Sequence, residues 1–204
     1  MNRENPEPTV FIVDDDPAMR RSLQLLVESI GLSAELYESG EVFLEQLKSD
    51  RPGCVIMDVR MPGKSGMDLQ DELAKSDESI QIIFISAHGT VPMALRTIKA
   101  GALHFFEKPF DSQEMVDCIQ YAIQTDATAR AALVEKRHIQ KGLDQLTTRE
   151  RQVLDMVVAG KVNKIIGHEL GISERTVENH RANIMKKMNA SSIADLIRAT
   201  LITG

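Results

Sequence analysis

Acidic, hydroxyl and basic side chains follow four apolar runs of the sequence, at the point where each run ends. The acids at 14–16 come directly after one run and Asp58 after another, while Ser86 and Lys108 follow two later runs. Carboxylates gathered at one place repel one another unless a dication lies between them, and Mg²⁺ prefers a few carboxylates with several waters kept. A hydroxyl and an ammonium beside that metal suit the oxygens of a phosphoryl group. The sequence therefore predicts a magnesium site that handles a phosphoryl group.

Short apolar runs alternate with longer amphipathic segments over the first 124 residues. Nearly continuous apolarity is typical of parallel strands that are buried on both faces. The fold class we expect here is an α/β doubly wound five-stranded parallel sheet, in which the carboxyl ends of the strands share one edge. The expected strands are 10–13, 34–37, 54–57, 80–85 and 103–106, and the expected helices are 17–30, 40–49, 66–74, 91–100 and one that begins after Asp111.

The pattern changes to helices only after Leu146. A glycine turn at Gly171, followed by the N-capping residue Ser173, separates two short helices and is typical of a helix-turn-helix. An Ala-rich stretch without Gly or Pro precedes this region and favours a helical linker, with an exposed disordered connector as the alternative. We expect four parts, namely an N-terminal tail at 1–8, an α/β domain at 9–124, a helical linker at 125–143 and an all-α four-helix domain at 144–204.

Composition and charge exclude several classes of protein. Among the 204 residues, 43% are hydrophobic and 26% are charged, which excludes a disordered chain. No apolar run approaches the roughly 20 residues that cross a bilayer, so we expect a cytoplasmic protein without membrane contact. The net charge of −6 divides into −9 for residues 1–140 and +3 for residues 141–204. This asymmetry is expected when only the second part meets an anionic partner.

Residues 9–124 resemble the receiver domain of bacterial two-component response regulators. The resemblance lies in V-D-D-D at 13–16, D-V-R-M-P-G-x-S-G at 58–66, S-A at 86–87 and E-K-P-F at 107–110, in that order and spacing. It implies that Asp58 accepts a phosphoryl group and that Mg²⁺ is held by Asp14, Asp15, Asp58 and the backbone carbonyl of Arg60. It further implies that Lys108 pairs with the phosphate, that Ser86 moves to hydrogen-bond it, and that Phe105 is the aromatic switch residue.

Three features depart from that pattern or add to it. Ser86 stands where Thr is commoner, which preserves the hydroxyl, and Phe105 stands where Tyr is common, which removes a polar handle. Asp16 is an extra acid that we interpret as a solvated loop residue. A magnesium-dependent phosphohydrolase of the haloacid-dehalogenase type is the rival, with Asp14 as its nucleophile. That motif wants Thr or Val where this chain has Ala18, and no cap domain is inserted.

Residues 144–204 resemble the LuxR-type helix-turn-helix of the NarL/FixJ family and lean towards the FixJ branch. The matching segments are L-T-x-R-E-R-x-V-L at 146–154, G-K-V-N-K-I-I at 160–166 and the helix at 172–188. Gly167 stands where the family usually has Ala and is expected to destabilise its helix by up to about 1 kcal/mol relative to Ala. The resemblance implies double-stranded DNA as the partner.

Base and phosphate contacts are predicted from side-chain chemistry on the expected recognition helix. Glu178 can accept a hydrogen bond from cytosine and Asn179 can pair with adenine, so these two are the predicted base readers. Glu150 is predicted to make a bond inside the domain and not to contact DNA. The predicted phosphate contacts are Asn163, Lys164, Arg175, Thr176, Arg181, Lys186 and Lys187.

The two resemblances together predict a transcription factor and not a metabolic enzyme. A sensor histidine kinase would phosphorylate Asp58, the phosphorylated chain would form a homodimer, and the dimer would bind promoter DNA and meet RNA polymerase. The receiver would catalyse only its own phosphotransfer and dephosphorylation. A receiver that gates DNA binding without phosphate is the alternative from a different class, and the presence of Asp15, Asp58 and Lys108 argues against it.

Overall fold

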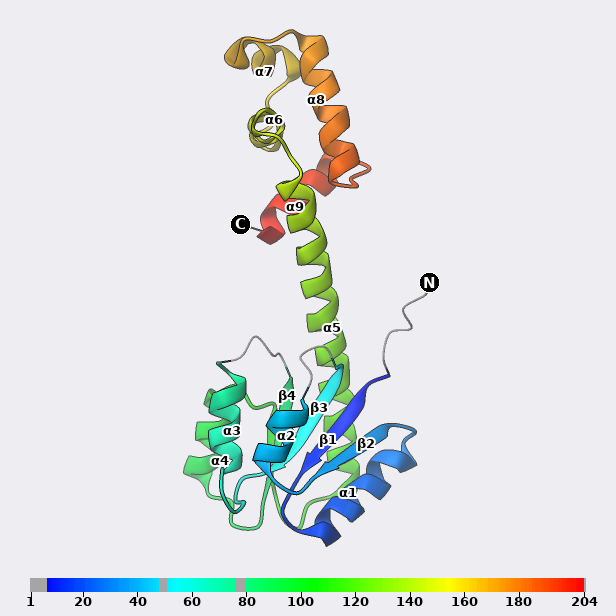
Figure 1. Ribbon diagram of the computed structural model, residues 1–204, viewed down its shortest axis with the longest axis vertical. Coiled ribbons are helices and arrows are strands. Elements are labelled where there is room, and N and C mark those ends of the chain that lie inside the picture. Colours follow the sequence, from blue (N-terminus) through cyan, green and yellow to red (C-terminus); the bar gives the residue numbers. More distant parts are fainter. Residues whose placement is uncertain (1–6, 48–50, 76–79, 204) are drawn as a thin grey trace. The chain divides into compact units, whose positions relative to one another are not determined.

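The computed structural model describes residues 7–47, 51–75 and 80–203, and these divide into two compact units at Arg130. The first unit contains a five-stranded parallel sheet in the order β2-β1-β3-β4-β5, which confirms the predicted fold class. The strands are β1 (Thr9–Val13), β2 (Ser33–Tyr37), β3 (Gly53–Asp58), β4 (Gln81–Ser86) and β5 (His104–Glu107) (Figure 1). The register pairs Val13 with Met57 and Ser86 with Glu107, so the carboxyl ends of neighbouring strands share one edge.

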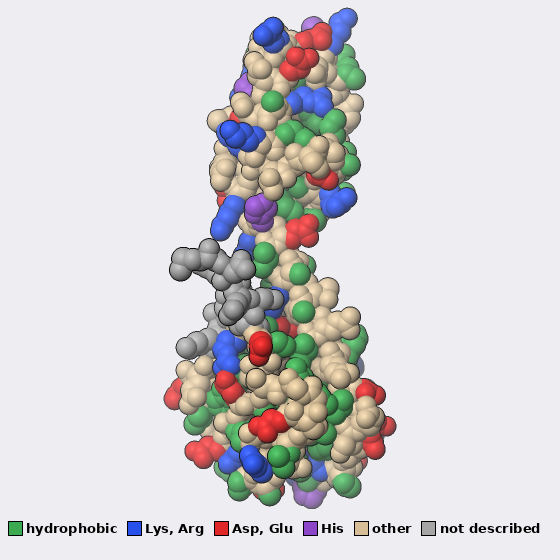
Figure 2. Space-filling model, turned by 90° about the vertical axis from the view of Figure 1, so that its right-hand side faces the viewer, with side chains coloured by type: hydrophobic (Ala, Val, Ile, Leu, Met, Phe, Trp, Pro, Cys, Tyr) green, Lys and Arg blue, Asp and Glu red, His purple; other side chains and the backbone are tan. Residues whose placement is uncertain are grey.

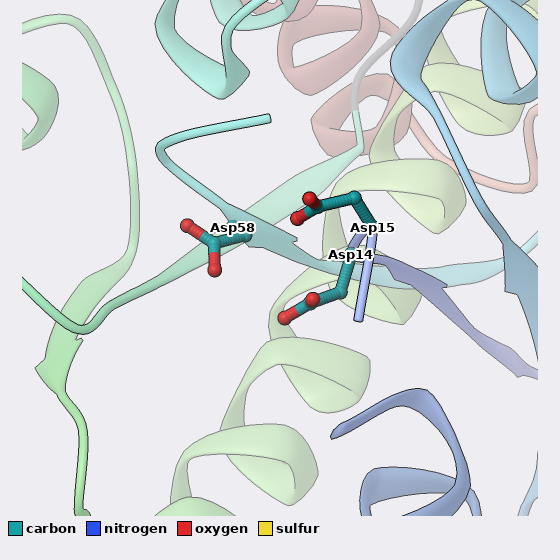
Figure 3. Close-up of side chains that lie close together, drawn as sticks. All are labelled: Asp14, Asp15 and Asp58. Carbon is teal, nitrogen blue, oxygen red and sulfur yellow. The ribbon is translucent and has the colours of Figure 1, made fainter. Parts of the chain in front are cut away.

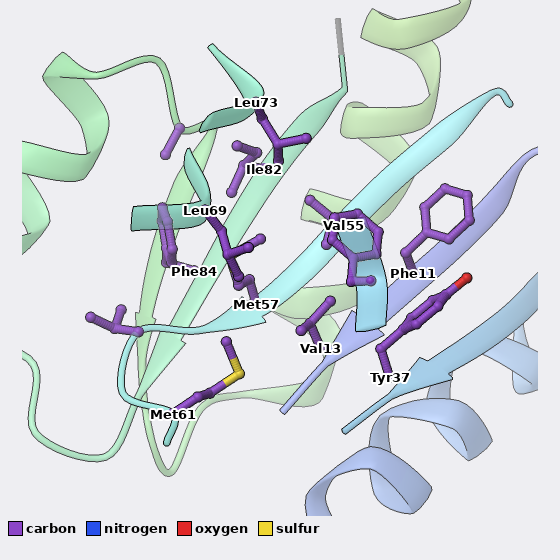
Figure 4. Packing of buried hydrophobic residues seen from close by; sticks show 13 residues of the cluster. Phe11, Val13, Tyr37, Val55, Met57, Met61, Leu69, Leu73, Ile82 and Phe84 are labelled. Carbon is purple, nitrogen blue, oxygen red and sulfur yellow. The ribbon is translucent and has the colours of Figure 1, made fainter. Parts of the chain in front are cut away.

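Helices cover both faces of this sheet. Apolar residues of α1 (Pro17–Ser29) and the first part of α5 (Ser112–Asp144) pack on one face. The other face is covered by α2 (Gly40–Gln46), α3 (Gly66–Leu73) and α4 (Val91–Lys99). Figure 4 shows this second layer, where Leu69 and Leu73 of α3 lie beside Met57 of β3 and Ile82 and Phe84 of β4. Burial on both faces explains the unbroken apolarity of β1, β3 and β4.

The observed boundaries differ from the predicted ones by a few residues. The helix predicted at 40–49 ends at Gln46, because Leu47 is extended, and residues 48–50 lie outside the described part of the chain. Residues 1–6 of the predicted tail also lie outside it. The stretch at 125–143 lies within the single helix α5. Cys54 is buried and Cys118 is half-buried, and both are free thiols.

The second unit is helical and has its own core. After the end of α5 come α6 (Thr148–Val158), α7 (Asn163–Leu170), α8 (Glu174–Lys187) and α9 (Ile193–Thr203). Gly171, with φ of 65°, ends α7, and the Ser173 side chain caps α8, as the sequence predicts for a helix-turn-helix. Ile139 and Leu143 of α5 pack against this core. Among the described residues, no helix is both long and apolar enough to cross a membrane.

Gly167 has a packing role that the sequence prediction missed. A Cβ atom at this position would lie 2.8 Å from the carbonyl oxygen of Ile172, in the turn between α7 and α8. The glycine thus permits a close backbone approach in the helix-turn-helix, and loosening of α7 is not its only effect.

Candidate functional site

Three carboxylates gather at the carboxyl edge of the sheet. Asp14 and Asp15 follow β1, Asp58 ends β3, and each offers a ligand oxygen within 4.8 Å of the others (Figure 3). Asp14 is fully buried and Asp58 is buried, whereas Asp15 is exposed. The predicted cluster therefore forms. Three carboxylates of which one is open to solvent are a donor set that suits Mg²⁺, since this ion keeps several waters.

Lys108 joins two of these acids. Its Nζ lies 2.8 Å from Oδ2 of Asp14 and 2.6 Å from Oδ2 of Asp58. Burial raises the pKa of Asp14, although the hydrogen bond from Lys108 opposes the rise. Burial lowers the pKa of Lys108, but the hydrogen bonds and charges of the two acids outweigh it and the pKa is raised. Lys108 therefore stays charged and balances the buried carboxylates.

Ser86 and Phe105 lie next to this cluster through the pairing of β4 and β5. Ser86 is fully buried, its carbonyl accepts a hydrogen bond of 2.8 Å from the Lys108 backbone N–H, and its hydroxyl accepts one of 3.3 Å from the backbone N–H of His88. Phe105 is half-buried and pairs with Phe84 in the sheet register. A Cβ atom at Gly89 would lie 2.9 Å from the Phe105 ring, so the ring packs on the loop that follows Ser86.

Several residues that the sequence prediction missed hold the loops of this site. The Asp16 side chain caps α1 by accepting from Ala18 N–H at 2.8 Å, so Asp16 has a structural role and is more than a solvated loop residue. Arg20 donates to the Asp14 carbonyl at 2.6 Å. Glu41 of α2 accepts from the Lys64 backbone N–H at 2.9 Å. The Asp-Pro pair at 16 and 17 was a sequence signal for the cap, whereas the other two contacts connect different elements and leave no local pattern.

Arg60 lies two residues beyond Asp58, in the loop after β3. Its backbone N–H donates to Oδ1 of Asp58 at 2.8 Å, which shapes the turn. The role of its carbonyl in binding a metal stays a prediction.

The second unit presents one polar face of α8 to solvent. Arg175, Glu178, Asn179 and Lys186 are exposed, and Thr176 is half-buried. The opposite face of α8 is buried through Val177, Ile184 and Met188. This division follows the helical period of about 3.6 residues per turn. In helix-turn-helix domains the second helix enters the major groove of DNA with its exposed polar face.

Two of the residues that were predicted to contact phosphates, Asn163 and Arg181, form a hydrogen bond with each other. Arg181 donates from Nη1 to Oδ1 of Asn163 at 2.6 Å, which ties α8 to the first residue of α7. Lys164, the next residue of α7, is exposed.

For Lys187 the structure supports a role other than the predicted phosphate contact. Its Nζ lies 2.7 Å from Oε2 of Glu150, which is 3% exposed, and 3.1 Å from the carbonyl of Gln145. Glu150 also closes a capping box with Thr147 at the start of α6. The predicted internal bond of Glu150 is therefore confirmed, and the Lys187 ammonium is committed to it.

Comparison with known families assigns both units. The family described as "Response regulator receiver domain" matches residues 10–120, and "Bacterial regulatory proteins, luxR family" matches residues 144–200. The response regulator protein TodT of Pseudomonas putida is 46% identical over 191 residues, which cover 94% of this chain and 84% of TodT. The transcriptional regulatory protein FixJ of Rhizobium meliloti is 42% identical over 196 residues, 96% of each chain.

Solved structures extend the similarity to the fold. The response regulator StyR has a TM-score of 0.88 at 42% identity, covering 96% of this chain and 98% of StyR. Full-length FixJ from B. japonicum has a TM-score of 0.60 at 37% identity, covering 98% of both chains. With its acidic sheet edge and its helix-turn-helix, the chain belongs to the two-component response regulators that join a receiver domain to a LuxR-type DNA-binding domain, and it is a transcriptional regulator of the FixJ type.

Proposed function

We propose that a sensor histidine kinase phosphorylates Asp58 and that this switches the chain to a DNA-binding homodimer. The observation that carries the proposal is the position of Asp58, whose carboxylate lies 2.6 Å from Lys108 Nζ and beside Asp14 and Asp15. An acid that is buried next to a cation and two more acids suits phosphoryl transfer, which depends on positioning and charge. The receiver thus serves as a switch.

Mg²⁺ is the proposed cofactor of this site. Asp14, Asp15 and Asp58 would hold it together with the backbone carbonyl of Arg60. The fit rests on the chemistry of the donors, which are all oxygen atoms, and on the exposure of Asp15, which leaves access to water. When bound, the ion neutralises the charge of the phosphoryl oxygens.

The side chains of this chain perform the transfer. An oxygen of the Asp58 carboxylate attacks phosphorus, the P–N bond to the kinase histidine breaks, and the histidine nitrogen keeps the electron pair. The Lys108 ammonium then moves its contact from the free carboxylate to a phosphoryl oxygen. The Ser86 hydroxyl donates to another phosphoryl oxygen, and the Phe105 ring follows it inward. Such a shift requires two states of the receiver that bind the phosphoryl group with different free energies.

An apolar stripe on α4 supports dimerisation of the phosphorylated receiver. Val91, Leu95 and Ile98 are 73%, 55% and 44% exposed and follow the helical period. Burial of these side chains against a second copy would remove them from water, and β5 and α5 complete the face next to them. The dimer would bring two copies of α8 onto half-sites about one helical turn apart.

The proposed DNA contacts lie on α8 and at the start of α7. Glu178 and Asn179 read bases, and Lys164, Arg175, Thr176 and Lys186 contact phosphates. Asn163 and Arg181, which bond to each other, would hold α7 and α8 in place and reach the phosphate backbone from there. Bound to promoter DNA in the cytoplasm, the dimer would meet RNA polymerase.

DNA affinity, measured with and without a phosphodonor, tests the proposal. Acetyl phosphate and Mg²⁺ are expected to tighten binding of the wild-type chain to its promoter fragment at least tenfold and to leave Asp58→Asn unchanged. Equal tightening of both proteins would contradict the proposal. Tight binding of both proteins without any donor would favour a receiver that works without phosphate.

A further inference from the structure

A buried acid outside the phosphorylation site connects α5 to the sheet. Asp126 is 1% exposed, and its Oδ2 accepts a hydrogen bond of 2.9 Å from the backbone N–H of Gly53. Arg130, one turn further along α5, donates from Nε to Oδ2 and Oδ1 of Asp126 at 2.8 and 3.0 Å. Gly53 begins β3, and Asp58 ends the same strand. The contact therefore lies at the amino-terminal edge of the sheet, opposite the acidic cluster.

Arg130 extends the connection to further strands. Its Nη2 donates to the Arg51 carbonyl at 2.5 Å. The Arg51 guanidinium pairs with both carboxylate oxygens of Glu35 in β2 at 2.6 Å and donates to the Thr9 hydroxyl in β1 at 3.3 Å. Through Asp126 and Arg130, α5 is thus linked to the amino-terminal ends of β1, β2 and β3.

The backbone donor that meets Asp126 is fixed by the fold. Gly53 has a φ of 143°, and a Cβ atom there would lie 1.8 Å from the Thr9 carbonyl oxygen. Only glycine fits this approach of β1 to β3. The backbone N–H of Gly53 donates to Asp126, so this fixed donor at the start of β3 is paired with a side chain of α5.

The free-energy cost of burying a carboxylate indicates that Asp126 does more than stabilise the fold. A buried carboxylate costs free energy unless it is paired, and apolar residues of similar volume often stabilise a fold as well as a buried ion pair. The neighbouring buried positions of α5, Met115, Ile119 and Ala122, are apolar. What an ion pair adds is a single allowed geometry. The residues that follow, 131–138, are all exposed, so the pair is the last anchor of α5 within the first unit.

We propose that Asp126 is a positioning residue for signal output. Together with Arg130, Asp126 attaches α5 to the amino-terminal edge of the receiver sheet. A conformational change in the receiver then moves the linker helix as a rigid body instead of unfolding it locally. An unsupported helix is marginal in water and residues 131–138 are all exposed, so we expect this segment of α5 to depend on the anchor at its start. The part of this inference that concerns signalling rests on the proposed function.

Hydrogen exchange of the full-length chain tests the anchor itself. In Asp126→Asn, amides at 124–138 are expected to exchange at least tenfold faster than in the wild type. Asp117→Asn is the matched control, because Asp117 is an exposed acid of the same helix and its side chain accepts a local hydrogen bond from Gln113. Arg130→Gln, which leaves Asp126 bonded to Gly53, is the second variant should Asp126→Asn fail to fold, and the same direction is expected. Exchange equal to the wild type in the folded variant would overturn the anchor.

The phosphoryl response tests the coupling. The variants are expected to take up phosphoryl on Asp58 as the wild type does, measured by intact mass with acetyl phosphate and Mg²⁺. The gain in DNA affinity on phosphorylation is expected to fall at least fivefold in Asp126→Asn and to stay unchanged in Asp144→Asn, an exposed acid at the end of α5 in the second unit that accepts a hydrogen bond from Gln140. Fast exchange with an undiminished gain would overturn the coupling. A wild-type chain that takes up no phosphoryl group would contradict the proposed function. The hydrogen-exchange result would still show whether Asp126 anchors α5 to the sheet.

Discussion

Three successive acids after β1 have three different surroundings. Asp14 is buried and bonded to Lys108, Asp15 is exposed beside Asp58, and Asp16 caps α1. Only the first two belong to the acidic cluster at the sheet edge. The same residue type thus serves charge balance at Asp14 and helix capping at Asp16, and the proposed role of Asp15 is metal binding.

Mg²⁺ binding is expected to depend on the carboxylate of Asp15 and not on that of Asp16. A ligand that binds only the folded protein raises its melting temperature, so Mg²⁺ is expected to stabilise the wild type. Asp15→Asn removes a cluster carboxylate and is expected to reduce that stabilisation by more than half, measured by thermal unfolding in Mg²⁺ concentrations from zero to about 20 mM. Asp16→Asn has the same change in charge and still caps the helix. An equal Mg²⁺ response in all three proteins would exclude the acidic cluster as the metal site.

Glu150 is a buried acid of the second unit that forms an ion pair with Lys187. The hydrogen bond from Lys187, with those of Thr147, lowers the pKa of Glu150 to about 2. A lowered pKa stabilises the folded state at every pH above the ordinary value near 4.5, and the stabilisation is lost as pH falls from there towards 2.

Neutralising this acid is therefore expected to destabilise the second unit. Glu150→Gln should lower its free energy of unfolding by about 1–3 kcal/mol at pH 7. The difference between the two proteins should shrink as pH falls from 4.5 towards 2, since the wild type then loses the same charge. Native-state hydrogen exchange of α6 and α8 amides at several pH values measures it, and a difference that does not change with pH would contradict the ion pair.

At the scale of the element, α8 divides its two terminal lysines between two tasks. Lys186 is exposed on the polar face, whereas Lys187 is bonded to Glu150 and Gln145 on the side of α6. The sequence presents the two lysines as equivalent. Their positions, 100° apart on a helix, make them different.

Substitution of each lysine is expected to give a different defect. Lys186→Met should weaken DNA binding about equally for all sequences and reduce the slope of log K against log salt by about 1. Lys187→Met should mainly lower the melting temperature of the second unit, because it leaves Glu150 buried and unpaired. Affinity titrations at four salt concentrations and thermal unfolding separate the two effects. The reverse assignment of the two defects would refute this division of roles.

The sequence predicts those features whose cause lies in residues that are close to one another along the chain. The strands, the helices and the Ser173 cap follow from periodicity and cap residues, and the structure confirms them apart from small differences in their boundaries. The acidic edge also follows, because parallel strands end together. The contacts of Glu41, Asp126 and Lys187 join residues 23 to 73 positions apart, and no local pattern encodes them.

At the scale of the whole molecule, the charge is divided between the units. The face of the first unit seen in Figure 2 carries acidic side chains, in red, spread over its surface, in keeping with its negative net charge. The second unit is the basic one. An acidic domain does not favour contact with DNA, so the basic unit must supply the attraction, and a dimer doubles it.

Dimerisation is expected to depend on both the phosphoryl group and the α4 stripe. With acetyl phosphate and Mg²⁺, light scattering after gel filtration should give the mass of a dimer for the wild type and of a monomer for Leu95→Glu. A charge in the middle of an apolar contact disfavours burial, whereas exposed Leu95 lies outside the acidic cluster. Leu95→Glu should therefore take up phosphoryl normally. A dimeric phosphorylated Leu95→Glu would exclude α4 from the contact.

The intact mass of the chain shows directly whether Asp58 carries a phosphoryl group. After incubation with acetyl phosphate and Mg²⁺, the wild type is expected to gain the mass of one phosphoryl group, about 80 Da. The gain should disappear without the metal and in Asp58→Asn. A phosphoryl group that Asp58→Asn still carries would contradict the assignment of Asp58 as the acceptor. If the wild type gains no mass even with a phosphorylated histidine kinase as donor, the proposed switching of this chain by phosphorylation is contradicted.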